Sequence, residues 1–505
     1  MNDPVLWTLI AIQVSMGAFD TLYHHEGTER LAWRPSQRNE LRLHGVRNLF
    51  YAALFICFGW FEPRGLFTFV LATILILEIL ITLWDFVEED LTRKLPASER
   101  INHTLLALNY GAIIAFASPY LYTWSQMETG IVATSYGWWS VFATLSAVGV
   151  FVFGVRDLVA AVRCDRLVQP DAAELVSGLD GRKHVLITGG TGFIGTRLVE
   201  ALVAGGHHVT VLTRKKSHAE GLACPIRVVT DFAQIHNDER YDVVINLAGE
   251  PIADGLWTKR KRHKIIGSRV DMTKQVVALI ARLDRKPECL ISGSAIGWYG
   301  MHTDEKLTEE SGAKDCFVHQ VCAKWETEAA RATHHRTRVV TLRLGLVLGA
   351  EAGILARLLT PFEFGLGGPL GSGNQWMSWI ALDDVVRLVA FVMANDEIYG
   401  PVNATAPHPV RNKEFTATLG RSLYRPALFR VPAALLTLLL GDLARETMLS
   451  SQRVLPEKLT KAGFRFRYPK IEQTLRVITG TMHTSGGTNT APSTRLAKKS
   501  AFASS

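Results

Sequence analysis

Long apolar stretches separated by short polar loops dominate the first third of the chain. Five of these stretches approach the roughly 20 residues that an α-helix needs to cross the hydrocarbon core of a bilayer. They cover residues 5–23, 45–61, 65–86, 104–122 and 138–162. Five such runs are difficult to bury inside one soluble core, so the pattern predicts an all-α bundle of about five transmembrane helices over residues 1–163.

The charges of the connecting loops predict how this bundle is oriented. Basic residues gather in the first and third loops, at Arg30, Arg34, Arg38, Arg42, Arg93, Lys94 and Arg100, whereas residues 123–137 contain no Lys or Arg. Loops on the cytosolic side of a membrane carry an excess of Lys and Arg. We therefore expect a multi-pass protein of the cell (inner) membrane, with its N-terminus outside and every residue after the fifth helix in the cytosol.

After residue 163 the pattern becomes that of a soluble α/β protein. Residues 164–182 are polar and predict a linker. Strands are predicted at residues 184–188, 208–212, 226–229, 243–247, 290–292 and 339–342, with helices after the first strand and around 273–283 and 318–332. Strands that alternate with helices predict a doubly wound parallel sheet of the Rossmann type over residues 183–400.

Two smaller segments follow. Residues 401–478 are predicted to form a small α+β C-terminal domain on the substrate side. Its apolar stretch at 431–440 is too short to span a bilayer, so we expect a core helix there. Residues 479–505 are rich in Ser, Thr, Gly, Ala and Lys and predict a disordered tail.

Composition narrows the classes of function. A chain of 505 residues exceeds what one hydrophobic core supports, in line with several domains. The net charge of +8 could suggest a nucleic-acid partner, but no basic run is interleaved with aromatic residues, so we expect none. The six cysteines are isolated and form no CxxC pair, which predicts neither a disulfide framework nor a zinc knuckle.

A glycine-rich motif stands between the first predicted strand and its helix. Its members are Gly189, Gly190, Thr191, Gly192, Phe193, Ile194 and Gly195. Glycines at this place let the backbone approach a pyrophosphate, which then sits on the N–H groups of the helix N-terminus. The strand–loop–helix–strand order favours a dinucleotide site over a tight turn without ligand.

The end of the second predicted strand indicates which dinucleotide binds. NAD enzymes place a carboxylate there for the ribose 2′-hydroxyl. This chain has Thr213, Arg214, Lys215 and Lys216 instead, and their cations suit a 2′-phosphate. We therefore expect NADP rather than NAD; the alternative is a set of solvated surface cations.

Further motifs resemble those of an extended short-chain dehydrogenase/reductase. They begin with Asn246-Leu-Ala-Gly249 and Ser292-Gly-Ser-Ala-Ile-Gly-Trp-Tyr-Gly300 and continue with Arg343-Leu-Gly-Leu-Val-Leu-Gly349 and Gly400-Pro-Val-Asn-Ala-Thr-Ala-Pro407. Their order resembles the atypical, epimerase-like subgroup that carries a C-terminal domain of unknown function. The resemblance covers about residues 183–478 and leaves residues 1–163 unexplained.

This resemblance implies an NADP-binding domain with a substrate cleft beside the C-terminal part. Gly189, Gly192 and Gly195 would then hold the pyrophosphate and Arg214 the 2′-phosphate. Ala248 and Gly249 would lie near the nicotinamide. The glycine-rich residues 365–373, with Trp376 and Trp379, would line the cleft unless they form a plain surface loop. Asp383 and Asp384 are expected to cap the helix that follows them.

The catalytic set that the resemblance implies is incomplete. The superfamily uses a Ser, a Tyr and a Lys four residues after the Tyr, and the phenolate moves the substrate proton. Ser294 and Lys324 match two of these positions, but Gln320 stands in place of the Tyr and cannot transfer a proton. Tyr299 could replace it, unless it is a packed aromatic, and so could a substrate-bound water.

Two functions stay open at this point. One is a membrane-tethered, NADP-dependent oxidoreductase or epimerase-like enzyme that acts on a small or lipidic substrate. The other is a non-catalytic, NADP-binding regulator of the membrane domain.

Ionisable side chains gather at the predicted cytosolic side of the bundle. Candidate ligands for a transition metal there are His24, His44, Asp85 and His103. His and carboxylate ligands contributed by several helices suit iron, manganese or zinc. The alternative is ion pairing with the loop arginines, which the absence of a Glu-x-x-His pair favours.

Overall fold

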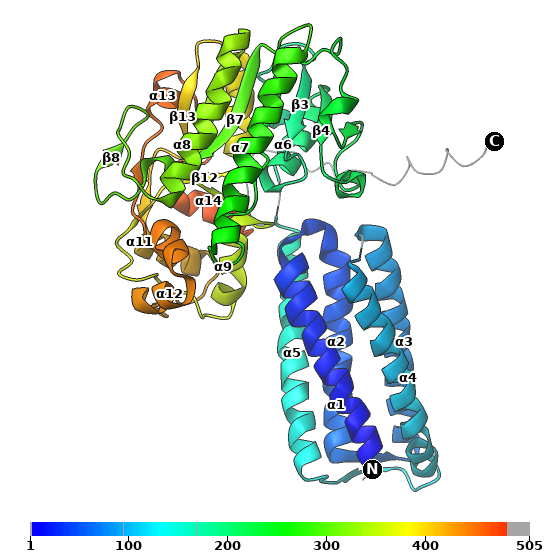
Figure 1. Ribbon diagram of the computed structural model, residues 1–505. Helices are drawn as coiled ribbons and strands as arrows, with labels where there is room; N and C mark the ends of the chain where they lie inside the picture. The colour runs from blue at the N-terminus through cyan, green and yellow to red at the C-terminus, as the bar shows by residue number, and fades with distance from the viewer. Residues whose placement is uncertain (1–2, 94, 168, 482–505) are drawn as a thin grey trace, which may run out of the picture.

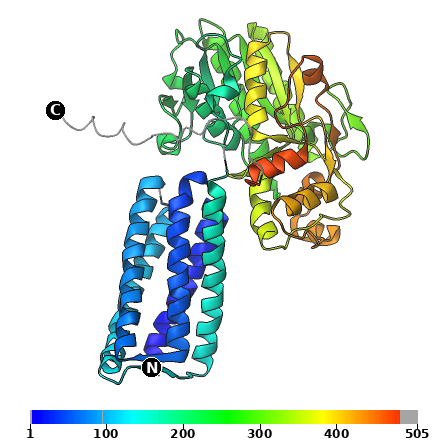
Figure 2. The same cartoon turned by 180° about the vertical axis from the view of Figure 1, so that it is seen from behind.

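The computed structural model describes residues 3–93, 95–167 and 169–481, and it divides into a helical bundle and an α/β domain (Figure 1). The N-terminus lies at the end of the bundle that is far from the α/β domain, and Figure 2 shows the same arrangement from behind. The tail predicted at residues 479–505 lies, from residue 482 onward, outside the described residues.

The bundle consists of the five helices that the sequence predicts. They are α1 (Pro4–Phe19), α2 (Arg38–Trp60), α3 (Leu66–Thr92), α4 (Ala97–Ser125) and α5 (Trp138–Cys164). The side chain of Asp3 caps α1 by accepting a hydrogen bond from the Val5 amide, and Pro4 occupies the first turn. Strands β1 (Phe61–Arg64) and β2 (Gly130–Ala133) pair antiparallel. They join the loop between α2 and α3 to the loop between α4 and α5, at the end of the bundle that is far from the α/β domain.

Apolar side chains cover the outside of the bundle as well as its inside. Leu6, Trp7 and Leu71 pack in its core, whereas Leu66, Leu108 and Leu145 are each more than half exposed. Four stretches are long and apolar enough to cross a membrane, namely α1 with its continuation to Trp33, α3, α4 and α5. The first turns of α2 carry charged side chains that make this helix more polar than the other four.

A π-helix, η1 (Asp20–Glu29), continues α1 toward the α/β domain. Two short 3₁₀ turns, η2 (Leu31–Trp33) and η3 (Pro35–Gln37), lead from it into α2. In a π-helix the backbone hydrogen bonds join residues five apart. The amide of Arg30, at a φ of +53°, closes the last of them on the His25 carbonyl. Residues five apart therefore share a face of this segment.

A seven-stranded sheet forms the centre of the α/β domain, and all of its strands are parallel. Their order across the sheet is β13-β9-β7-β6-β3-β4-β5. In chain order they are β3 (His184–Thr188), β4 (His208–Leu212), β5 (Arg227–Val229), β6 (Val243–Asn246), β7 (Cys289–Ala295), β9 (Arg338–Leu344) and β13 (Gly400–Ala404). This order confirms the predicted doubly wound Rossmann-type sheet, and the sheet extends to Ala404, beyond the boundary predicted at residue 400.

Helices cover both faces of the sheet. On one face lie α6 (Phe193–Ala204) and α10 (Leu382–Ala394), which pack on residues such as Ile187. On the other face lie α7 (Lys259–Arg282) and α8 (Phe317–Ala330). The helix predicted at 273–283 is the apolar second half of α7, whose basic first turns start from the Thr258 cap.

The remaining elements form a smaller region beside the sheet. Its helices are α9 (Gly353–Glu363), α11 (Asn412–Ser422), α12 (Ala433–Leu440), α13 (Glu457–Lys461) and α14 (Ile471–Ile478). Its strand pairs are β8 (Lys306–Leu307) with β15 (Arg453–Val454), β10 (Leu346–Leu348) with β12 (Trp379–Ala381), and β11 (Trp376–Met377) with β14 (Val410–Arg411).

The prediction of a core helix at residues 431–440 is wrong. No residue of α12 is buried, and Leu438 and Leu439 are 82% and 60% exposed. Apolar composition alone does not distinguish a helix that packs inside a domain from one that lies on its surface.

Helix α9 connects the α/β domain to the bundle. The carboxylate of Glu363 pairs with Arg156 and Arg163, both on α5. The Arg163 guanidinium lies 3.6 Å from the ring centre of Trp33, which packs in the same apolar cluster as residues of α9. The two parts therefore share an interface of buried charge and apolar contact.

Candidate functional site

The glycine loop lies where the strand order of the sheet reverses. It follows β3, whose two neighbours are β4 and β6, and it ends in the first turn of α6. In open α/β sheets, ligands bind at such a switch point, outside the carboxyl ends of the strands. Gly192 precedes α6 as its cap, and the first N–H groups of that helix have no partner within it.

Two glycines of the loop leave no room for a side chain. A Cβ on Gly195 would lie 2.1 Å from the carbonyl oxygen of Gly189, and one on Gly189, at a φ of +74°, would lie 2.7 Å from the carbonyl carbon of Leu247. A Cβ on Gly192 would meet only the Gly189 oxygen, at 3.2 Å. The loop is therefore a tight cradle of bare backbone, as a pyrophosphate site requires.

Two further predicted cofactor residues lie near this loop. The close approach of Gly189 to the Leu247–Ala248 peptide places Ala248 beside the cradle. Gly249 is exposed and follows directly. On the other side, Arg214, Lys215 and Lys216 follow β4 and are all exposed. The structure thus brings the predicted pyrophosphate and ribose sites to one edge of the sheet.

A buried chain of hydrogen bonds lies at the carboxyl ends of β7 and β9. The Ser294 hydroxyl donates to Glu326 Oε1 at 2.6 Å. Arg343, which stands opposite Ser294 in the strand register, donates from Nε and Nη2 to the two oxygens of Glu326, both at 2.9 Å. Ser294 is 2% exposed and therefore held in one orientation. The sequence reasoning missed Glu326 and Arg343, because their pairing depends on tertiary contact.

Comparison with known proteins identifies the α/β part. The profile of the NAD dependent epimerase/dehydratase family matches residues 185–404, and that of a domain of unknown function matches residues 431–478. A chloroplastic epimerase family protein of Arabidopsis thaliana is 39% identical over 306 residues, which are 59% of this chain and 87% of the relative. The epimerase family protein YfhF of Bacillus subtilis is 36% identical over 57% of this chain and 95% of its own length.

The chain belongs to the NAD dependent epimerase/dehydratase family. A solved structure of a human epimerase family protein, SDR39U1 with NADPH, shares 30% identity and a TM-score of 0.55. That match covers 59% of this chain and 100% of the human chain. Because the family match begins at residue 185, it does not include the helical bundle.

In this epimerase family member, Tyr299 is a core residue. Its side chain is fully buried, and its hydroxyl lies 2.7 Å from Asn403 Oδ1 and 2.9 Å from the Thr308 carbonyl oxygen, and accepts a hydrogen bond from Arg343. Burial raises the pKa of the Tyr299 phenol above its usual value. Three protein partners therefore occupy this hydroxyl, in line with the alternative of a packed aromatic.

The other two predicted catalytic side chains differ in environment, because Ser294 is buried and Lys324 is exposed. Lys324 lies exposed on α8, and within the described residues no hydrogen bond links it to Ser294. Gln320, one turn earlier on the same helix face, is also exposed and donates to Asp315. A proton relay of the common Ser-Tyr-Lys kind is absent from these positions.

The glycine-rich residues 365–373 pack against a neighbouring segment. A Cβ on Gly368 would lie 2.2 Å from the Phe429 carbonyl oxygen, and Phe429 and Val431 donate backbone hydrogen bonds to Gly367 and Pro369. The close approach of two backbones therefore explains why glycines stand at these positions, without a cleft that they would line.

The two tryptophans assigned to the cleft differ in environment. Trp379 is fully buried in β12, and its indole N–H donates to the His408 carbonyl. Trp376 is half-buried and donates to Asp304. Only Trp376 therefore keeps a face toward solvent.

The two aspartates expected to cap a helix lie in the first turn of α10. Asp383 pairs with Arg197 of α6. The buried carboxylate of Asp384 accepts hydrogen bonds from the amides of Arg467 and Tyr468. Both therefore stabilise the packing around α10 rather than face a substrate.

A second cluster of ionisable side chains lies in the bundle, at the end next to the α/β domain. Two groups could hold a metal ion by the spacing of their ligand atoms: Asp20, His25, Glu99 and His103, and His25, Glu40, His44 and Glu89. All seven residues are buried. Of the four ligands predicted from sequence, His44 and His103 fall within these groups.

The other two predicted ligands lie beside the groups. His24 Nδ1 is 2.8 Å from Asp20 Oδ1 and its Nε2 is 3.2 Å from the Ser98 hydroxyl, so both ring nitrogens have partners. Asp85 accepts a hydrogen bond from Arg47 at 2.7 Å. The analysis of apolar runs missed a sequence signal for these ligands. In two places a Glu precedes a His by four residues, at Glu40 and His44 and at Glu99 and His103.

Proposed function

We propose that this protein is a membrane-tethered, NADP-dependent oxidoreductase of the epimerase type, with its dinucleotide site on the cytosolic side. The observation that carries the proposal is the glycine cradle at the switch point of the sheet, where Gly189 and Gly195 exclude any side chain. The similar human protein, whose structure was solved with NADPH, supports the choice of NADP over NAD.

The residues of the cradle fit a dinucleotide. Gly189, Gly192 and Gly195 would hold the pyrophosphate against the first turn of α6, and Arg214 would pair with the 2′-phosphate. Ala248 and Gly249 would lie along the nicotinamide half. Bound NADP would supply hydride chemistry at the nicotinamide.

The role of Ser294 follows from its partner. Because its hydrogen is directed at the Glu326 carboxylate, the hydroxyl oxygen has only lone pairs to offer. Ser294 would therefore accept a hydrogen bond from a substrate hydroxyl and orient it, while the proton moves through a substrate-bound water. Arg343 and Glu326 act as positioning residues that hold this orientation.

The membrane part of the proposal is supported by the surface of the bundle. Four helical stretches have the length and apolar character of membrane spans, and large apolar side chains point outward from them. Helix α12, whose leucines are exposed, lies at the lower end of the α/β domain, to one side of the bundle (Figure 1). A substrate of lipidic character would reach the cytosolic site from this side.

Binding of NADPH and NADH to the purified full chain tests the proposal. Loss of the Arg214 guanidinium removes charge-assisted hydrogen bonds of about 1.5–3 kcal/mol, so Arg214→Ala should weaken NADPH about 10- to 100-fold and leave NADH nearly unchanged. Arg285→Ala is a matched control, since Arg285 is equally exposed but precedes β7 at the opposite edge of the sheet. Equal losses for both nucleotides, or no binding of either, would contradict the assignment.

A second candidate function is a regulator that binds NADP without turnover. The observation that favours it is the exposed Gln320 at the position of the superfamily's catalytic Tyr. It predicts that Ser294→Ala preserves cellular function whereas loss of NADP binding abolishes it. The oxidoreductase proposal predicts that both changes abolish function, and that lipid extracts accelerate NADPH oxidation by the wild-type protein.

A further inference from the structure

Two groups of metal-ligating side chains lie side by side at the end of the bundle and share one construction. Glu99 and His103 are four residues apart on α4, and Glu40 and His44 are four residues apart on α2, so each pair occupies one face of its helix. His25 of the π-helix belongs to both groups. We propose that this end of the bundle is a transition-metal centre, with an ion bound by Asp20, His25, Glu99 and His103.

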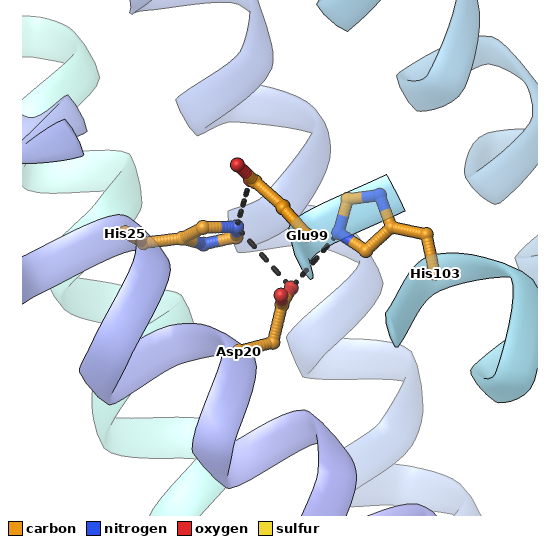
Figure 3. A group of neighbouring side chains, drawn as sticks. All are labelled: Asp20, His25, Glu99 and His103. Carbon is orange, nitrogen blue, oxygen red and sulfur yellow. Dashed lines mark hydrogen bonds and ion pairs between the residues drawn. The ribbon is translucent and has the colours of Figure 1, made fainter. Parts of the chain in front are cut away.

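The four side chains of the proposed site converge on one point (Figure 3). Asp20 Oδ2 lies 3.0 Å from His103 Nε2 and 3.3 Å from His25 Nε2, and His25 Nε2 lies 3.6 Å from Glu99 Oε1. All four ligand atoms lie within 4.8 Å of one another. In a tetrahedral shell with bonds of 2.0–2.2 Å the ligand atoms are roughly 3.3–3.6 Å apart, so a bound ion would move Asp20 and His103 slightly apart and bring the more distant ligand atoms closer together.

Hydrogen bonding accounts for only part of this convergence: Asp20 Oδ2 and His103 Nε2 form a hydrogen bond of 3.0 Å, whereas His25 Nε2 forms none. His25 is 6% exposed, yet its Nε2 makes no hydrogen bond to either carboxylate that it faces. His44 Nε2 and both carboxylate oxygens of Glu89 also form no hydrogen bond, although His44 Nε2 lies 2.9 Å from Asp85 Oδ2 and Glu89 Oε2 lies 3.3 Å from His103 Nδ1. Buried polar atoms without partners are rare and need an explanation. A shared cation that the nitrogen and oxygens face provides one.

The charge of the cluster also favours a bound cation when its histidines are neutral. Five carboxylates are buried there, namely Asp20, Glu40, Asp85, Glu89 and Glu99. Over the part of the chain that the structure describes, two arginines reach them: Arg47 pairs with Asp85, and Arg93 with Glu40 and Glu99. An excess of three negative charges is left, and unpaired buried charge is costly. A divalent ion would neutralise most of it.

Neighbouring residues hold two of the proposed ligands in place. Asp20 Oδ1 accepts from Asn102 at 3.1 Å and faces His24 at 2.8 Å, which leaves Oδ2 directed toward His25 and His103. Arg93 donates to both oxygens of Glu99. Such outer contacts, which fix the orientation of a ligand, are a regular feature of metal sites. His24 is thus a positioning residue rather than a ligand.

The proposed site lies on the wall of a large cavity. A partly open pocket of about 690 Å³ lies among the helices of the bundle, and its walls are mainly apolar but include Asp20 and His103. An ion held by these residues would be accessible to an apolar molecule in the cavity. Imidazole and carboxylate together select iron, manganese or zinc rather than magnesium or calcium.

Metal analysis of the full chain in detergent tests the proposal. After incubation with Zn²⁺, Mn²⁺ or anaerobic Fe²⁺ and removal of free ions, wild-type protein should keep about one equivalent of one of these metals. His25→Ala and His103→Ala should lose most of it. Glu78→Gln is the matched control: Glu78 is an equally buried carboxylate of α3, eleven residues or about 16 Å from Glu89, and it should keep the metal.

A spectroscopic measurement on the wild-type protein covers the case in which these variants do not fold. Co²⁺ should give visible absorption bands of a nitrogen–oxygen site, and Zn²⁺ should displace them. Metal below one tenth of an equivalent, together with no Co²⁺ bands, would overturn the proposal and leave protonated histidines to balance the carboxylates. Metal retained in both His variants would overturn it as well. NADPH binding is measured on the same samples, so that failure of the dinucleotide proposal is seen separately.

Discussion

At the scale of the residue, the tightest geometric constraint in the glycine loop is the contact between Gly195 and Gly189. A Cβ on Gly195 would collide with the carbonyl oxygen of Gly189. Both positions are fixed by backbone that packs against neighbouring elements, so neither can move to relieve the contact. The glycine at position 195 is required by this approach rather than by its φ. The nearby Gly192 has more room, with 3.2 Å to the same oxygen.

We expect Gly195→Ala to weaken NADPH binding, because the added methyl group forces the loop away from the first turn of α6. Overpacking of this kind costs about 1–3 kcal/mol, which corresponds to a loss of affinity of roughly 10- to 100-fold. Titration of nucleotide fluorescence measures the loss. Gly178→Ala, at a position where a Cβ meets nothing within 4 Å, should bind as the wild type does. Wild-type affinity in Gly195→Ala would show that the cradle does not bind the dinucleotide.

At the scale of the element, α12 is the helix whose surroundings differ most from the expectation. It carries Leu435, Leu438 and Leu439 on its exposed surface, near the exposed Leu428 and Phe429 of the preceding segment. A continuous apolar surface of this kind is typical of a partner or membrane contact. Its place beside the end of the bundle makes the bilayer the partner that we expect (Figure 1).

A fluorescent label at residue 438 tests this expectation in the full chain. With the exposed Cys224 replaced by serine, an environment-sensitive dye on Leu438→Cys should shift to shorter wavelength in lipid nanodiscs and be quenched by lipid-attached spin labels. The same dye on Arg285→Cys, at the amino edge of the sheet, should show neither effect. Quenching of the residue 438 label by aqueous iodide alone would exclude a membrane contact of α12.

At the scale of the whole molecule, the bundle and the α/β domain are joined through α9. Glu363 sits between Arg156 and Arg163 of α5, and Thr360 donates to Glu26 of the π-helix. On the same helix, Arg357 donates to the Ala253 carbonyl, in the segment that follows Ala248. The dinucleotide edge and the proposed metal end of the bundle are thus connected by one short helix.

The proposed topology predicts opposite labelling at the two ends of the molecule. In intact bacterial cells that express the full chain, a membrane-impermeant maleimide should label Gln126→Cys, in the loop between α4 and α5. It should not label Arg285→Cys until the cells are opened. The reason is the excess of Arg in the loops near the α/β domain and its absence from residues 123–137. Labelling of both positions, or of Arg285→Cys alone, would reverse the orientation or exclude the membrane.

The sequence by itself determined the features that depend on local pattern. Runs of apolar residues set the five helices, and alternating strands and helices set the parallel sheet, because backbone hydrogen bonds and burial select these periods directly. The glycine motif was readable for the same reason, since its strand, loop and helix are contiguous. Arg214 could be singled out because its place is a fixed distance after β4 in the chain.

Only the tertiary structure decided which side chains meet. His25 joins the proposed metal site because the π-helix brings the residue five after Asp20 close to Asp20 Oδ2, while His24, four after Asp20, contacts Oδ1. Glu99 joins it because α4 begins at Ala97, before the apolar run. Ser294 is bound to Glu326, and Tyr299 is buried. These contacts join residues far apart in the chain, and their energies depend on packing that no local pattern encodes.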